Sequence, residues 1–133
     1  FGSGIEDIAL ATVDAMAYQV ADVLDSMTLD AGEAIGALRV DGGAAVNDAL
    51  LQFQADILRV PVERPRVTET TALGAAFLAG LGAGTWSSVD ELAATWQLDR
   101  RFEPQMEQAQ RDALVQRWRH AVERAKGWNA GAP

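Results

Sequence analysis

The sequence predicts an α/β fold that is rich in helices and contains a few short strands. Long segments carry apolar residues at helical spacing, whereas segments 34–40 and 60–67 are short and either apolar or rich in β-branched residues. The order strand, helix, strand across these two segments is typical of a crossover between parallel strands. Because two strands make a poor sheet by themselves, we expect residues outside this chain to complete the sheet.

The composition excludes several classes of protein. The length of 133 residues fits one domain, and the apolar fraction of 49% is ordinary for a globular chain. The absence of Cys excludes disulfides, thiol catalysis and Cys-ligated zinc, and the single histidine, His120, excludes sites with paired imidazoles. A net charge of −8 argues against nucleic-acid binding. Because no apolar run is long enough for a membrane span and no signal-peptide pattern is present, we expect a cytoplasmic protein.

The first segment predicts one long amphipathic helix over residues 4–30. Ser3 and Glu6 have the spacing of a capping box, and Gly32 can end the helix. The expected apolar face consists of Ile5, Ile8, Ala9, Met16, Val20, Val23, Leu24 and Met27. Residues 1–38 contain seven acidic residues and no Lys or Arg. This asymmetry favours a solvated helix face, with a docking surface for a basic partner as the alternative.

The remaining pattern predicts helices over 46–58, 68–83, 89–96 and 106–128, and an extended segment or loop over 100–102. The helix over 68–83 is dominated by small residues. Such a helix forms either one wall of a nucleotide cleft or, as we favour, a closely packed cover on the sheet. We expect Trp118 and Trp128 to hold the last helix against the body, and residues 129–133 to fray.

The candidate site follows the first predicted strand, at Asp41, Gly42 and Gly43. Glycines lack a Cβ, so a ligand can approach the backbone there, and the helix that follows offers free N–H groups to a phosphate. Ligands of open α/β sheets bind at this carboxyl end of a strand. Asn47 can then contact a base or a ribose. A tight turn without a ligand remains the alternative, and Asp41 either orients a Mg²⁺-bound water or anchors the loop.

These residues, with those that follow, resemble the carbohydrate kinases of the FGGY family. The resemblance rests on Leu38–Asn47, Leu51–Leu58, Val60–Pro65 and Glu69–Ala76, and the last two segments are most similar to family members that phosphorylate glycerol. It spans almost the whole chain. It implies that residues 1–133 form the C-terminal part of the second, nucleotide-binding domain of such a kinase, with an actin-like, ribonuclease-H-like ATPase fold.

The resemblance also implies an activity and a division of roles. ATP, with Mg²⁺, gives its γ-phosphoryl group to glycerol and yields sn-glycerol 3-phosphate. Gly43 matches the glycine whose backbone meets the nucleotide phosphates, Asn47 matches the residue that contacts the adenosine part, and Gly42 and Ala44 flank them. No catalytic base or metal ligand is expected within these residues, because the family's base and glycerol pocket precede Phe1.

Three further expectations follow from this resemblance. The isolated chain should bind ATP weakly and fail to phosphorylate glycerol, because phosphoryl transfer needs several positioned groups at once. The full-length enzyme should be a homo-oligomer. The alternative to a kinase fragment is a stand-alone α/β binding module that docks a basic partner through its acidic first helix.

Overall fold

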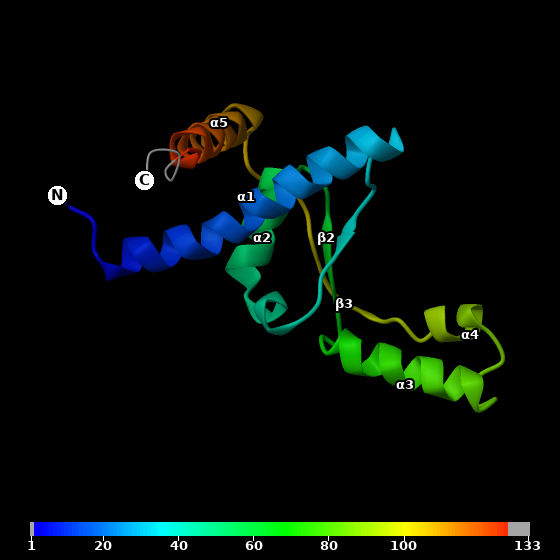
Figure 1. Cartoon of the computed structure of the whole chain (residues 1–133). Coiled ribbons are helices and arrows are strands. Elements are labelled where there is room, and N and C mark those ends of the chain that lie inside the picture. Colours follow the sequence, from blue (N-terminus) through cyan, green and yellow to red (C-terminus); the bar gives the residue numbers. More distant parts are fainter. Residues whose placement is uncertain (1, 128–133) are drawn as a thin grey trace, which may run out of the picture.

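The computed structural model describes residues 2–127. In chain order its elements are α1 (Ile5–Ala31), β1 (Leu38–Arg39), the short 3₁₀ helix η1 (Gly43–Val46), α2 (Asp48–Leu58), β2 (Val62–Pro65), α3 (Thr70–Gly82), α4 (Val89–Ala93), β3 (Leu98–Phe102) and α5 (Gln108–Ala125). The helices α1, α2 and α5 gather at one end of the molecule, and α3 and α4 extend away from the other (Figure 1).

The sheet has three strands in the order β1-β2-β3. Strands β1 and β2 are parallel, with Leu38 opposite Val62, which confirms the predicted crossover. Strand β3 runs antiparallel to β2, with Phe102 opposite Val62. The sequence predicted two strands and left residues 100–102 as an extended segment or a loop; in the structure this segment belongs to the third strand. The sequence did not identify it as a strand because four of its five residues are exposed and three of these are charged, so it shows no apolar run.

Helix α2 packs against both parts of a small core. One cluster consists of Leu51, Ala55, Val62 and Phe102, with Leu38 and Val40 packed against it. The other consists of Ala21, Ile57 and Val115, with Tyr18, Phe53, Leu58 and Leu114 packed against it. The first cluster joins α2 to the sheet, and the second joins it to α1 and α5.

The ends of α1 differ in part from the prediction. The helix is capped at Gly4, whose N–H donates to the Asp7 carboxylate at 2.8 Å, so the predicted Ser3–Glu6 capping box was wrong by one residue. The predicted end is confirmed. Gly32 adopts a φ of 69°, and its N–H donates to the Thr28 carbonyl at 2.9 Å.

The packing face of α1 also differs from the prediction. Only Ala17 and Ala21 are buried, whereas most of the predicted large apolar residues are exposed or half-buried, Ile5 to 86%. Small side chains at these two positions let α2 approach the axis of α1 closely. Tyr18 completes the contact, because its ring meets Phe53 edge-on at a centroid distance of 5.6 Å.

Helix α3 buries no residue, so the expected close packing of this helix on the sheet was wrong. Its main support is the segment that leads into α4. The indole of Trp86 lies against Gly80 and meets the Phe77 ring edge-on at a centroid distance of 5.3 Å. Helix α4 ends at Ala93, earlier than predicted, and Ser88 caps its start by accepting the N–H of Glu91.

Helix α5 is held against α1 by two polar contacts and one aromatic contact. The indole N–H of Trp118 donates to Asp22 at 2.7 Å, and its ring stacks on Tyr18. Arg119 pairs with Asp25 at 2.8 Å. The expected role of Trp118 is confirmed, whereas the predictions for Trp128 and for residues 129–133 lie outside the described residues. Within residues 2–127, no helix is long and apolar enough to cross a bilayer.

Candidate functional site

The candidate site is the loop over residues 41–47, which joins β1 to α2. Gly42 has a φ of 79° and a ψ of −179°, a region of backbone space that is essentially restricted to glycine. Its N–H donates to the Thr68 carbonyl at 2.7 Å. The geometry of the turn therefore explains this glycine without any ligand.

Gly43 is different, because none of the residues that the structure describes requires a glycine there. Its φ lies outside the left-handed region, and a Cβ added to it would meet no heavy atom within 4 Å. Gly43 and Ala44 are both exposed and begin η1. The start of a helix leaves N–H groups without an internal partner, so this backbone is open to an anion from solution.

Asn47 does not lie inside the helix, although the sequence predicted a helix over residues 46–58. The 3₁₀ helix η1 precedes it, and α2 begins only at Asp48. Asn47 is the N-cap of α2, where its Oδ1 accepts the N–H of Leu50 at 3.1 Å. Because the oxygen is engaged in this cap, the amide nitrogen is the group that can donate to a ligand.

Asp41 anchors the loop. Its carboxylate accepts a hydrogen bond from the hydroxyl of Thr70, the first residue of α3. This contact favours the anchoring role over the alternative of orienting a Mg²⁺-bound water. In the part of the chain that the structure describes, no three His, Cys, Asp or Glu side chains lie together as a metal site would need. The described residues therefore offer Mg²⁺ no ready-made cluster of protein ligands.

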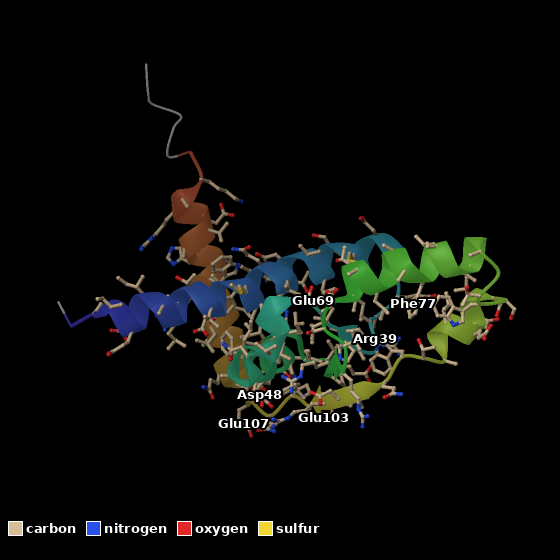
Figure 2. The ribbon with its side chains drawn as sticks, turned by 90° about the horizontal axis from the view of Figure 1, so that it is seen from below. Arg39, Asp48, Glu69, Phe77, Glu103 and Glu107 are labelled. Carbon is tan, nitrogen blue, oxygen red and sulfur yellow. The ribbon has the colours of Figure 1, made fainter. Side chains whose placement is uncertain are left out.

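Charged side chains support the loop from the strands. Asp48 lies in the first turn of α2 and pairs with Arg64 of β2 at 2.7 Å and with Arg100 of β3. Figure 2 shows Asp48 beside the β3 strand. Hydrogen bonds to Asp48 and then to Asp99 raise the pKa of the Arg64 guanidinium above its ordinary value. Sequence reasoning missed Arg64, whose only signal was its place in the segment that resembles the kinases.

Two hollows flank this region. The one beside the loop has a volume of about 740 Å³ and is lined by Val46, Asn47, Asp48, Ala49, Arg64, Pro65, Arg66, Thr68 and Asp99. The other, about 520 Å³, lies between the sheet and α3 and includes Arg39 and Phe77, both labelled in Figure 2. Of the four predicted residues, Asn47 lines the first hollow, and Gly42, Gly43 and Ala44 lie on the turn before it.

Comparison with known proteins gives a consistent result. Residues 2–83 match the C-terminal domain of the FGGY family of carbohydrate kinases. The chain is 60% identical over 121 residues to a glycerol kinase from Nitratidesulfovibrio vulgaris (strain DP4), covering 91% of this chain and 24% of that protein. It is 55% identical over 129 residues to a glycerol kinase from Aromatoleum aromaticum, covering 97% and 26%. The chain thus spans about a quarter of the length of these relatives.

Solved structures agree with the sequence relatives. The Plasmodium falciparum glycerol kinase with ADP matches with a TM-score of 0.76 at 34% identity, over 93% of this chain and 26% of that one. A xylulose kinase from Lactobacillus acidophilus matches with a TM-score of 0.71 at 20% identity, over 95% and 25%, and so supports the fold alone. These neighbours confirm the predicted α/β class within the actin-like, ribonuclease-H-like ATPases.

The alternative of a stand-alone module that docks a basic partner finds no support. Two acidic residues of α1, Asp22 and Asp25, are bound by Trp118 and Arg119 of the chain's own last helix. The family match and the identities to glycerol kinases support the same family. The chain belongs to the FGGY family of carbohydrate kinases, in which it matches the C-terminal domain.

Proposed function

We propose that this chain supplies one wall of the adenine-nucleotide site in a kinase that transfers the γ-phosphoryl group of ATP to glycerol. The observation that carries the proposal is Gly43, an exposed glycine at the start of a helix that no internal contact explains. The identity of 55–60% to glycerol kinases supports glycerol as the acceptor. The similar glycerol kinase of Plasmodium falciparum was solved with ADP, which supports an adenine nucleotide here.

In this proposal the chain binds and orients, and it performs no proton transfer. The backbone N–H groups at Gly43 and Ala44 meet the nucleotide phosphates, and the amide nitrogen of Asn47 donates to the adenosine part. A new P–O bond forms to a terminal hydroxyl of glycerol while the bond from the γ-phosphorus to the β–γ bridging oxygen breaks. The hydroxyl proton passes to a base outside these residues, and the electron pair of the broken bond leaves with ADP.

The proposal includes further properties of the whole protein. Residues 1–133 would be the C-terminal part of its second actin-like domain. The whole protein would be a cytoplasmic homo-oligomer, and Mg²⁺ would accompany the nucleotide. The isolated chain would bind ATP weakly and would not phosphorylate glycerol, because catalysis of phosphoryl transfer depends on groups from both sides of a cleft.

The nucleotide site is tested by titrating the isotope-labelled chain with ADP and following backbone amide shifts by NMR. We expect the largest shifts at Gly42, Gly43, Ala44 and Asn47. Asn47→Ser keeps a good N-cap but lacks the amide donor, so it should leave the free energy of unfolding nearly unchanged and weaken ADP binding by about five- to tenfold. Shifts that fall elsewhere on the chain would contradict the assignment.

A matched variant separates capping from binding. Ser88→Ala removes the N-cap of α4, far from the loop, and should cost about 1 kcal/mol of stability while leaving ADP binding intact. Glycerol is tested in a chimera in which this chain replaces the aligned residues of the Nitratidesulfovibrio vulgaris enzyme. ATP-dependent formation of glycerol 3-phosphate is expected from the chimera and not from the isolated chain. Turnover by the isolated chain would overturn the division of roles.

A further inference from the structure

The loop over residues 41–47 is held at its two ends by hydrogen bonds. At its start, Gly42 and Asp41 are bound by residues 68 and 70, and at its end Asn47 caps α2. These contacts do not involve the residue at the centre of the loop. That centre is Ala45, of which only 2% of the surface is exposed.

One side chain reaches this centre from the sheet. The Nη1 of Arg64 donates to the carbonyl oxygen of Ala45 at 3.1 Å and to the carboxylate of Asp48 at 2.7 Å. Its Nε donates to Asp99 at 2.7 Å. One planar guanidinium thus ties together the η1 turn, the first turn of α2 and the start of β3.

The position of Arg64 makes this contact well defined. The side chain is 15% exposed, and its guanidinium carbon lies 5.7 Å from the centre of the Phe102 ring. Asp48 is shared with Arg100, so two cations offset the negative charge on the residue that directly follows the loop. The fixed fork of a guanidinium can hold several oxygens at set angles, which a lysine ammonium cannot reproduce.

We propose that Arg64 is a positioning residue of the nucleotide site, which fixes the η1 turn so that Gly43 and Asn47 face one ligand together. Ala45 lies two residues from each of them, so a shift of its carbonyl moves both. Arg64 also turns the Asp48 carboxylate toward the strands and away from the phosphates. This inference rests on the proposed function. It adds a residue that does not touch the nucleotide but acts on the site by holding the loop.

The first test compares Arg64→Gln with Arg101→Gln in the 133-residue chain. Arg101 is a matched control, because it forms two ion pairs on the same sheet, with Glu63 and Glu103. Hydrogen exchange of the Ala45 and Asn47 amides, which close the η1 turn, reports on the loop without any nucleotide. Arg64→Gln should speed their exchange and weaken ADP binding by about tenfold, the loss of one to two hydrogen bonds. Arg101→Gln should change neither.

Two further variants separate geometry from charge and from loss of the fold. Arg64→Lys keeps the charge and the fold, and should weaken ADP binding by about threefold, because one ammonium cannot reach all three oxygens. Arg64→Gln combined with Asp48→Asn balances the charge, and should bind ADP as weakly as Arg64→Gln alone. In the chimera, the KM for ATP should rise about tenfold, whereas kcat and the KM for glycerol stay within about twofold.

The outcomes distinguish this inference from the proposed function. Unchanged exchange and unchanged ADP binding in Arg64→Gln would overturn the positioning role and leave the nucleotide site intact. Full recovery of binding in the double variant would overturn it in favour of a charge effect alone. If the unsubstituted chain shows no ADP-dependent shifts in this loop, the proposed nucleotide site fails, and the exchange measurement still decides whether Arg64 orders the turn.

Discussion

At the scale of single residues, Gly42 and Gly43 are neighbours with different physical reasons for being glycine. Gly42 has a backbone conformation that other residues rarely adopt. Gly43 has an ordinary conformation and open space where a side chain would be. The turn therefore requires a glycine at Gly42, whereas the described residues do not require one at Gly43, where we propose that the nucleotide approaches the backbone.

This difference predicts opposite outcomes for two alanine substitutions. Gly42→Ala should lower the free energy of unfolding by about 1–3 kcal/mol, because a Cβ is strained at its φ and ψ. Gly43→Ala should leave stability within about 0.5 kcal/mol, as for a surface change, and should weaken ADP binding. Urea unfolding followed by circular dichroism measures the first, and the NMR titration measures the second. Equal losses of stability would contradict this assignment.

Sequence reasoning located these glycines but misplaced Asn47. A 3₁₀ turn and the first turn of an α-helix give similar patterns over four residues, so the sequence could not separate η1 from α2. What separates them in the structure is Asn47, whose extended backbone (φ −87°, ψ 99°) ends η1 and caps α2. The hydrogen bond of Arg64 to the Ala45 carbonyl comes from a strand nineteen residues away, and no local pattern reports it.

At the scale of elements, α3 is held by the Trp86 contact and by the hydrogen bond of Thr70 to Asp41 rather than by a buried face. Trp86 lies so close to Gly80 that an added Cβ would come within 2.1 Å of its ring. Gly74, on the same helix, has open space around it. The two glycines therefore give a direct comparison of packing with helix propensity.

We expect Gly80→Ala to displace the indole of Trp86 and to lower the free energy of unfolding by about 1–3 kcal/mol, as overpacking does. Gly74→Ala should instead raise it by about 0.5–1 kcal/mol, because alanine favours the helix. Both are measured by denaturant unfolding, and a change in the Trp86 resonances should accompany only the first. Stabilisation by both substitutions would show that Trp86 does not constrain α3.

The elements were predicted well where a local pattern of apolar residues and glycines defines them. They were predicted poorly where contacts between distant residues define them. The helices and the parallel crossover follow from periodicity and from the glycine turn. Strand β3 was left as an extended segment or a loop because its charged residues are paired with residues on other elements, as Arg100 is with Asp48. The packing face of α1 was wrong because Ala17 and Ala21, rather than the larger side chains, meet the core.

At the scale of the whole molecule, the chain leaves a large apolar surface exposed. Large side chains on α1 and α3 are the clearest cases: Ile5 is 86% exposed, Ile8 66%, Leu29 83% and Leu78 73%. Ile5 and Ile8 are three residues apart and so share one face of α1, and neighbouring exposed apolar side chains of this kind favour association. The chain alone should therefore associate with copies of itself, and this association should be separable from its folding.

The prediction is tested with two kinds of variant. Replacing Ile5 and Ile8 together by Gln should reduce self-association in sedimentation velocity and leave the free energy of unfolding nearly unchanged. Leu51→Ala, in the buried cluster, should lower that free energy by about 2–5 kcal/mol. If the exposed pair proves as important for stability as Leu51, α1 must be packed in solution in a way that differs from this structure.

The central place of α2 also constrains the order in which the chain folds. Its residues belong to both buried clusters, so both clusters depend on this helix. We expect the rate-limiting barrier to contain α2 with the strands on either side of it, because their contacts are close in sequence and cost little loop entropy. The weakly held α3 and α4 can join after that barrier, so this end of the molecule can open and close again while the rest stays folded.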